Sequence, residues 1–394
     1  MTLLAVAEAQ ARILALARPL PEETVPLLAA AGRFAAREVT ALRTQPAADL
    51  SAMDGYAIRF ADLPGPWRVV GESAAGRAFA GSVGAGEAAR IFTGAAMPEG
   101  ADTVLVQEEA SREGDHMTLT GEGPPGLGRN VRRKGLDFST GDTLIARGTR
   151  MSPARIALAA TGCHGTVAVN RRVRVAVMAT GDELIAPGSN STDPLALPEG
   201  NSAMLAAMLA DLPVDVTMLG IIPDRLDTLT AAFAGARADI IVTTGGASVG
   251  DHDLVRPALE AAGGAIDFWR IALRPGKPML AGRLGEAVVL GLPGNPVSAF
   301  VTATLFLRPL IAAMASAADP LPRRLTATLG EPLPANDHRE DYLRATIADG
   351  RAFVAAIQDS SMLATLARAD CLIIREPHAA AAQKGEQVEI VTLA

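Results

Sequence analysis

The sequence is poor in cysteine and in lysine. Its 394 residues include only two cysteines, Cys163 and Cys371, which lie far apart in apolar surroundings. This pattern argues against a disulfide framework and against a zinc site, and it predicts two buried thiols. Only three lysines occur, Lys134, Lys277 and Lys384, so arginine carries nearly all of the positive charge.

The sequence also lacks an excess of positive charge and a long uncharged apolar run. Its net charge of -7 at pH 7 argues against a general nucleic-acid-binding surface. No apolar run without charges reaches the length of a membrane span. Residues 1–8 lack the basic region of a secretory signal and contain an acid. We therefore expect a cytoplasmic protein that binds neither nucleic acid nor membranes.

The central part of the chain alternates between short β-branched apolar runs and helical stretches. This alternation predicts a doubly wound α/β sheet with a crevice at the carboxyl ends of its strands. The expected strands cover residues 173–180, 214–222, 239–244 and 287–292, and the expected helices between them cover 201–212 and 224–236.

Three loops of this region are rich in glycine or positive charge. They are Gly245-Gly246-Ala247-Ser248, Arg274-Pro275-Gly276-Lys277 and Pro293-Gly294-Asn295-Pro296. Glycine lets a ligand approach the backbone, and Asn295 followed by Pro296 is typical of a helix start. Each loop alone is more simply an ordinary turn. Because a purely structural sheet needs no cations at its carboxyl edge, the three together predict one anionic ligand.

Shorter elements flank the α/β region. We expect helices over 2–17 and 24–33, a β-rich lobe from residue 38, and a helix that begins at Ser152-Pro153 and ends at Gly162. After Ala315, short apolar runs predict a small barrel or sandwich, with a hairpin at Asp349-Gly350.

Several polar residues in the lobe and after the strands are candidates for a site. In the lobe, Asp54-Gly55 is either a structural turn or a functional one, and the basic run 132–134 is either a solvated face or a contact for an anion. Three acids follow expected strand ends: Glu183, Asp224 and Asp251. Asp224 has a structural alternative as a helix cap.

Taken together, these motifs resemble the molybdopterin molybdenumtransferases, a bacterial family related to the C-terminal part of gephyrin. The resemblance covers the whole chain in order. The motifs that carry it are Ser51-Ala-Met-Asp54-Gly55-Tyr56-Ala, Ile91-Phe-Thr93-Gly94, Arg132-Arg133-Lys134-Gly135, Ala179-Thr180-Gly181-Asp182-Glu183-Leu, Thr243-Thr-Gly-Gly-Ala-Ser248-Val-Gly-Asp251, Arg274-Pro-Gly-Lys277-Pro and Gly291-Leu-Pro-Gly-Asn-Pro-Val297-Ser298.

The resemblance implies a multidomain fold with α/β and β-rich parts. Residues 1–45 and 139–170 would form an N-terminal helical and linker domain, and 46–138 an inserted β-rich lobe. Residues 171–318 would form the α/β molybdopterin-binding domain, and 319–394 a C-terminal β-barrel. It also implies an elongated homodimer, whose shared sites lie between the α/β domain of one subunit and the inserted lobe of the other.

The implied reaction inserts molybdate into the dithiolene of adenylylated molybdopterin, with Mg²⁺ as cofactor and release of AMP. By motif position, the resemblance gives catalytic roles to Asp54, Thr93, Arg132, Asp137, Arg274, Lys277 and Arg344. It gives ligand binding to Gly245, Gly246, Ser248, Pro293, Gly294, Asn295, Ser298 and Ser360. It gives the metal to Glu183, Asp224 and Asp251.

Two departures from the family pattern bear on these roles. The family often has lysine where this chain has Arg270 and Arg274, which keeps the charge and changes its geometry. Gly245-Gly246-Ala247-Ser248 stands where the sister family that adenylylates molybdopterin usually has Gly-Gly-Thr-Gly, which favours the transferase. Two alternatives stay open: that adenylyltransferase, and a gephyrin-like assembly protein. Further expected partners are the upstream adenylyltransferase and downstream molybdoenzymes.

Overall fold

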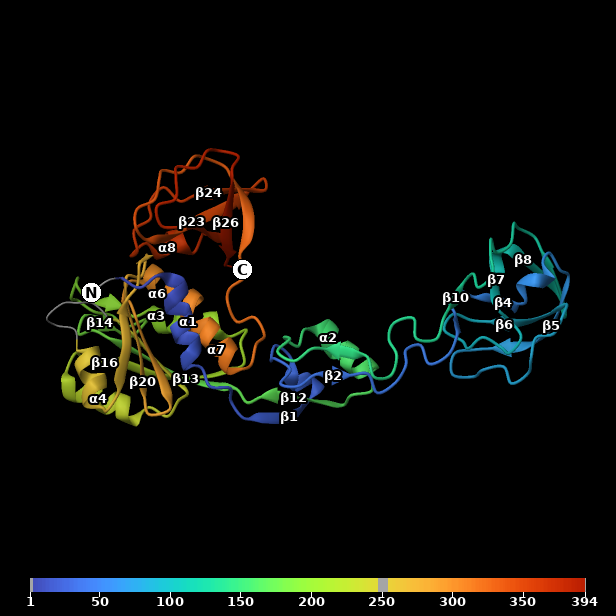
Figure 1. The fold of residues 1–394 in the computed structure, drawn as a ribbon, viewed down its shortest axis with the longest axis horizontal. Coiled ribbons are helices and arrows are strands. Elements are labelled where there is room, and N and C mark those ends of the chain that lie inside the picture. The colour runs from blue at the N-terminus through green and yellow to red at the C-terminus, as the bar shows by residue number, and fades with distance from the viewer. Residues whose placement is uncertain (1–2, 247–253, 394) are drawn as a thin grey trace.

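The chain forms an elongated molecule in a computed structural model that describes residues 3–246 and 254–393. Figure 1 shows an α/β part with a β-barrel beside it at one end, a slender linker in the middle, and a β-rich lobe at the other end. The lobe and the α/β part of one chain are therefore far apart.

A six-stranded sheet forms the centre of the α/β part. Its strand order is β16-β13-β17-β21-β20-β18, in which the first four strands are parallel and the last two are antiparallel to their neighbours. The strands are β13 (Val173–Thr180), β16 (Val214–Ile222), β17 (Ile240–Thr244), β18 (Ala265–Arg270), β20 (Pro278–Leu284) and β21 (Ala287–Leu292). The expected doubly wound fold is confirmed, with an antiparallel edge added to the parallel strands.

Helices cover both faces of this sheet because alternate strand residues point to opposite faces. Ile240 and Val242 pack in one core with the helices of one face, and Ile241 packs in a second core with those of the other. The first face carries α1 (Val6–Leu16), α3 (Asn201–Leu209), α6 (Pro296–Thr302), the π-helical turn η4 (Ala303–Leu307) and α7 (Arg308–Met314), and the second carries α4 (Leu226–Gly235) and α5 (Val255–Ala261).

One helical stretch, Pro296–Met314, is long and apolar enough to cross a membrane by length and composition alone. It comprises α6, η4 and α7, and 83% of its most apolar window is buried inside the protein. Its apolar side chains therefore serve the first core.

The linker is built from two short two-stranded sheets and one helix. β1 (Glu22–Pro26) pairs with β12 (Thr166–Asn170), and β2 (Val39–Thr40) pairs with β11 (Thr143–Ile145). Helix α2 (Pro153–Thr161) begins as expected, since Ser152 accepts a hydrogen bond from the N–H of Arg155. The expected helix over 24–33 is wrong: this segment is strand β1 followed by the 3₁₀ turn η1 (Leu27–Ala30).

The lobe contains a six-stranded sheet in the order β7-β4-β6-β5-β9-β8, and a separate pair formed by β3 and β10. The bounds are β3 (Leu50–Ser51), β4 (Gly55–Ile58), β5 (Trp67–Ser73), β6 (Glu87–Ile91), β7 (Thr103–Val106), β8 (Ala110–Glu113), β9 (His116–Leu119) and β10 (Val131–Arg132), with 3₁₀ turns η2 (Phe60–Asp62) and η3 (Gln107–Glu109).

The C-terminal region is a closed five-stranded barrel, because β23 pairs with both β24 and β25. Its strands are β22 (Leu325–Leu329), β23 (Glu340–Ala348), β24 (Arg351–Val354), β25 (Cys371–Arg375) and β26 (Gln387–Thr392). Asp349 and Gly350 form the expected hairpin, both with positive φ. β19 (Leu273–Arg274) of the α/β part adds to the edge of β23 and joins the two regions.

Candidate active site

The candidate site begins where the parallel strands end. Strands β13, β17 and β21 are joined in register, so the loops that follow them start at the same edge of the sheet. The hydroxyl oxygens of Thr180 and Thr243 at this edge are buried and have no hydrogen-bond partner in the described part of the chain. Such orphaned polar atoms are uncommon in protein interiors.

The two glycine loops touch each other at this edge. Gly245 donates its N–H to the carbonyl of Leu292, 3.2 Å away. Gly245 has φ +91°, and a Cβ there would lie 2.4 Å from the carbonyl oxygen of Thr180. Gly246 has φ +62° and would meet Val255 at 2.4 Å. A side chain is therefore excluded at both positions, because the loop packs closely against Thr180 and Val255.

Three acidic side chains follow β13 and β16. Asp182 accepts a hydrogen bond from the N–H of Asp224 at 3.0 Å. Burial, and then the charges of Asp182 and Glu183, raise the pKa of Asp224 above its ordinary value. In residues 3–246 and 254–393, no arginine, lysine or histidine pairs with these three acids within 4 Å. The cluster thus carries negative charge that no described cation neutralises.

The capping alternative for Asp224 is not supported. Helix α4 begins at Leu226, its N-cap residue is Arg225, and the helix has no side-chain cap. Hard carboxylate oxygens with excess negative charge suit Mg²⁺. No group of three acids, histidines or cysteines among the described residues is close enough to form a complete metal site by itself. Ser248 and Asp251, which the sequence also assigned to the site, lie outside the described residues.

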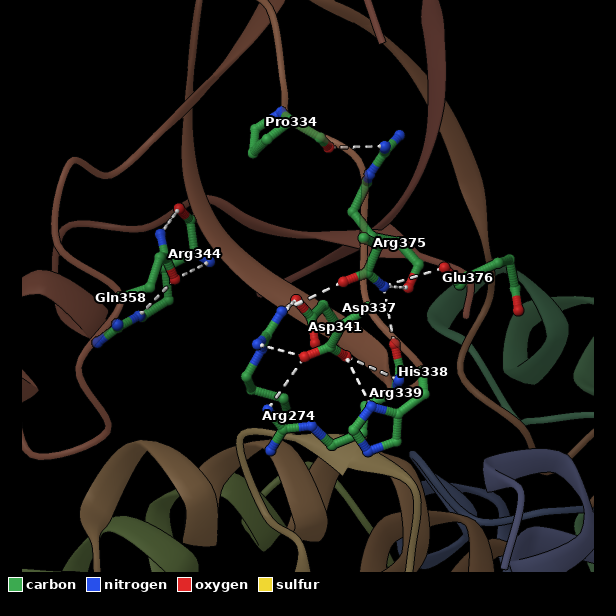
Figure 2. A network of polar contacts seen from close by, with 11 residues as sticks. Arg274, Pro334, Asp337, His338, Arg339, Asp341, Arg344, Gln358, Arg375 and Glu376 are labelled. Atoms are coloured by element: carbon green, nitrogen blue, oxygen red, sulfur yellow. Dashed lines mark hydrogen bonds and ion pairs between the residues drawn. The ribbon is translucent and has the colours of Figure 1, made fainter. Parts of the chain in front are cut away.

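The turn that carries Lys277 packs against helix α6. A Cβ on Gly276, at φ +119°, would lie 2.7 Å from the side chain of Thr302. Lys277 itself is exposed. Arg274, on the same turn, faces the barrel instead: its guanidinium bonds Asp341 and, at 3.0 Å, Asp337 (Figure 2). These ion pairs favour a role for Arg274 in holding the turn on the barrel.

The barrel contributes a buried cation near the start of α6. Arg344 is 1% exposed, and it donates to Gln358 at 3.2 Å and to main-chain carbonyls, as Figure 2 shows for its bonds to Gln358. Burial lowers the pKa of Arg344, although the charge of Asp359 acts in the opposite direction. No described carboxylate forms an ion pair with it. A buried guanidinium without a counterion is costly unless an anionic ligand joins it.

Ser360 connects the barrel to the Gly294 loop. Its hydroxyl accepts a hydrogen bond from Asn295 at 3.0 Å, and its carbonyl accepts one from the N–H of Val297 at 3.1 Å. Asn295 is the N-cap residue as expected, but its side chain makes no cap bond. Ser298 follows in the first turn and is 5% exposed. Ser360 and the loop 293–298, to which the resemblance gave ligand binding, are therefore brought together.

The lobe holds a second group of site residues. The N–H and the hydroxyl of Thr93 donate to one oxygen of Asp54, at 2.7 and 2.8 Å. These two bonds lower the pKa of Asp54, with a smaller effect from the charge of Arg90. Arg132 lies on β10, opposite Leu50 of β3, the strand that precedes the Asp54 loop. The side chain of Arg132 is exposed. Asp137 is also exposed, and its N–H donates to Gln45.

Sequence reasoning missed two members of these groups. Asp182 lies in the same motif as Glu183. An acidic side chain just after the end of a strand was the signal that could have identified it as a site residue. Arg90 is a charged residue within the apolar strand β6, which is a weak signal because alternate strand residues commonly face solvent.

Known proteins match this chain along most of its length. Residues 4–162 match the domain described as MoeA N-terminal region (domain I and II), residues 176–313 match the probable molybdopterin binding domain, and residues 326–393 match the MoeA C-terminal region (domain IV).

Relatives with curated names agree with these matches. A molybdopterin molybdenumtransferase of Haemophilus influenzae is 34% identical over 387 residues, covering 94% of each chain. One of Bacillus subtilis is 31% identical and covers 92% of this chain and 87% of its own. A crystal structure of the molybdopterin biosynthesis MoeA protein of Pyrococcus horikoshii is similar with a TM-score of 0.84 and 26% identity, covering 99% of this chain and 100% of that chain. The chain therefore belongs to the molybdopterin molybdenumtransferase (MoeA) family.

Proposed function

We propose that this protein inserts molybdenum into molybdopterin, using molybdate and adenylylated molybdopterin as substrates and releasing AMP. The relatives that match nearly the whole chain are named for molybdenum transfer to molybdopterin. The observation that carries the proposal is the sheet edge inside the probable molybdopterin binding domain. There, two glycine-containing loops touch beside unneutralised acids and the Lys277 turn.

The phosphates of the nucleotide fit the two glycine loops. Backbone N–H groups of Gly246 and Gly294 can donate to them, and the exposed Lys277 adds a point charge on a flexible side chain. Oriented donors of this kind stabilise negative charge that develops on the phosphoanhydride when AMP leaves.

Glu183, Asp224 and Asp251 would hold Mg²⁺ at the same edge. Bound there, the ion would neutralise charge on the anhydride. The acids suit this task because Asp224 has a raised pKa and no described cation beside it. Asp182, which accepts a hydrogen bond from the N–H of Asp224, would hold the main chain of that residue in place.

Arg344, Ser298 and Ser360 are proposed to bind molybdate. Molybdate is a tetrahedral dianion, which a buried guanidinium and nearby hydroxyls can recognise. Arg344 lacks a carboxylate partner among the described residues, whereas Arg274 is already engaged by Asp337 and Asp341. We assign Arg274 to support the Lys277 turn.

A second copy of the chain would complete the site. Strands β4, β6 and β10 of the lobe lie at the opposite end of the molecule from β13 and β16 of the α/β sheet (Figure 1). Asp54, Thr93, Arg132 and Asp137 would therefore reach the sheet edge only from a partner subunit. With an anionic carboxylate at its centre, this group is suited to orient or deprotonate the dithiolene end of the pterin.

The main test is a reaction with defined components. The purified chain should release AMP from adenylylated molybdopterin when molybdate and Mg²⁺ are present, and the product should activate a cofactor-free molybdoenzyme. AMP transfer from ATP to molybdopterin without activation would instead establish the adenylyltransferase. Binding of a molybdoenzyme with neither reaction would establish the assembly protein. The proposed setting is the cytoplasm, between an upstream adenylyltransferase and downstream molybdoenzymes.

Shared sites are tested with mixed dimers. A chain with Asp54→Ala and a chain with Asp224→Ala, each inactive alone, should recover about half of the activity when co-expressed and purified through two tags, because one of the two symmetric sites escapes both changes. No recovery in the purified mixed dimer would show that each subunit contains a complete site.

A further inference from the structure

Arg90 lies beneath the loop that carries Asp54, and its guanidinium is held by neutral groups. Its Cζ atom is 4.7 Å from the ring centre of Phe92 and 5.2 Å from that of Tyr56. One terminal nitrogen donates to the carbonyl of Gly55 at 3.0 Å, and the other donates to the side-chain oxygen of Gln107 at 2.6 Å. Ring faces attract a cation without neutralising it.

These contacts fix the main chain on both sides of the Asp54–Gly55 peptide. The carbonyl of Asp54 accepts the N–H of Gln107 at 3.1 Å, and the carbonyl of Gly55 accepts from Arg90. A Cβ on Gly55 would lie 2.0 Å from the carbonyl oxygen of Leu105, so the loop is pressed against β7. The loop cannot shift far without breaking these bonds.

The carboxylate of Asp54 is thereby held in place, and one of its two oxygens accepts all of its hydrogen bonds from described residues. Both bonds from Thr93 go to the same oxygen, Oδ1. No described group donates a hydrogen bond to Oδ2. The charged groups on neighbouring elements are Glu87 and Arg90 of β6, Arg132 of β10, and Glu108 and Glu109 of η3. Of these, Arg90 is the one whose charge acts on Asp54 enough to lower its pKa.

We propose that Arg90 is a positioning residue of the active site, which holds the Asp54 loop, leaves Oδ2 available to the substrate and places a positive charge beside the carboxylate. No ion pair within 4 Å ties Arg90 to a carboxylate among the described residues, so its charge acts on Asp54 with little local compensation. The proposal rests on the proposed function, because that reaction is one of its readouts.

The test compares Arg90→Gln and Arg90→Lys with a matched control, Arg68→Gln. Arg68 lies on the adjacent strand β5 and pairs with Glu87 on the surface. AMP release is measured for each purified dimer between about pH 3 and 7.5, a range that begins below the ordinary carboxyl pKa of about 3.9. Circular dichroism checks that each variant is folded.

Arg90→Gln should lower kcat/KM by about three- to tenfold, the effect of losing one or two hydrogen bonds. It should also move the acid limb of the pH profile to higher pH, because Asp54 binds its proton more readily without the neighbouring positive charge. Arg90→Lys should lose rate but keep the acid limb near that of the wild type, since the charge remains. Arg68→Gln should change neither rate nor limb.

Carbon-13 NMR of aspartate carboxyls in the full chain gives a readout that needs no activity, with the Asp54 signal identified through Asp54→Asn. A higher titration midpoint in Arg90→Gln than in the wild type supports the proposal even if AMP release fails and the proposed function falls. An unchanged midpoint overturns it, and so does a loss of kcat/KM with an unshifted acid limb in both Arg90 variants.

Discussion

Replacing Asp224 by asparagine gives the sharpest separation of metal binding from structure. Asparagine keeps the shape of the side chain and removes its charge. In the folded protein, burial and the charges of Asp182 and Glu183 raise the pKa of Asp224, so ionised Asp224 destabilises the fold when no cation is present. The variant removes this destabilisation.

The size and pH dependence of the effect follow from the exposure of the group and the sign of its pKa shift. Asp224 is half-buried and its neighbours are near solvent, so the repulsion should be about 0.5 to 1 kcal/mol. Because the folded pKa lies above the unfolded value of about 3.9, the destabilisation is present above the folded pKa and disappears below the unfolded one. In EDTA at pH 7.5, Asp224→Asn should therefore be more stable than the wild type, and the difference should vanish near pH 3.5.

Magnesium should reverse that order. At a Mg²⁺ concentration ten times its dissociation constant, the wild type gains about 1.4 kcal/mol, and the variant should gain less. AMP release by Asp224→Asn should fall steeply and recover partly at raised Mg²⁺. The matched control is Asp215→Asn, at the other end of the same strand, where the acid pairs with Arg172 at 2.7 Å. It should lose a little stability and keep the normal response to Mg²⁺.

The measurements are urea unfolding with and without Mg²⁺, and initial rates of AMP release at limiting and saturating Mg²⁺. A variant that is less stable than the wild type in EDTA would contradict the repulsion. Wild-type AMP release at limiting Mg²⁺, together with an unchanged Mg²⁺ stabilisation, would remove Asp224 from the metal site.

Three further predictions address the remaining parts of the molecule. Lys277→Ala should weaken binding of adenylylated molybdopterin by about 1.5 to 3 kcal/mol and that of free molybdate much less, by calorimetry, with Lys277→Arg partly restoring it; equal losses for both ligands would place Lys277 elsewhere. Asp239→Asn removes the carboxylate that pairs with Arg171 and Arg174, and it should cost about 2 to 3 kcal/mol of unfolding free energy at pH 7. Because these ion pairs lower the pKa of Asp239, the stability difference between variant and wild type should shrink as pH falls below about 4. A difference that stays constant down to about pH 3 would contradict this. Gly245→Ala should lower both stability and AMP release, because its Cβ would meet the carbonyl of Thr180. The control Gly188→Ala, at φ +80° with no atom within 4 Å of the added Cβ, should cost only about 1 kcal/mol of backbone strain. Similar losses of stability in both variants would show that the contact with Thr180 is relieved at no cost.

Local signals predicted much of the fold. The strand 214–222 was predicted at its observed bounds, since its β-branched residues end at a proline. Ser152-Pro153 predicted the start of α2, and Asp349-Gly350 predicted the barrel hairpin. In each case the deciding residues are neighbours in sequence, so the local preference and the final fold agree.

Pairing between distant residues decided the elements that the sequence did not predict. Residues 22–26 form a strand because they pair with residues 166–170, more than a hundred positions away. Helix α1 packs in the first core of the α/β part through Val6, Ala9 and Ile13. The linker segment that follows α1 in sequence gives no sign of this distant packing. The domain limits that the resemblance implied for residues 1–45 remain a proposal.

The ion pairs of Arg274 were also out of reach of the sequence. A guanidinium on the same turn as Lys277 predicts an anion-binding site, because both cations lie in one short motif. Asp337 and Asp341, which bind it, lie more than sixty positions further along the chain. Only the pairing of β19 with β23 brings them to Arg274.

The residues that break local rules gather where the site is proposed. Asn295 occupies the cap position of α6, yet it gives its amide to Ser360 of the barrel instead of capping the helix. Arg344 is buried without a described carboxylate, and Gly245 adopts a backbone conformation that a side chain would forbid. Each of these choices costs stability in the free protein. Folding alone gives no reason to accept these costs. Gly245 and Asn295 lie at the edge of the α/β sheet and Arg344 lies on β23 of the barrel, and the proposed anionic ligand is the simplest physical account of all three.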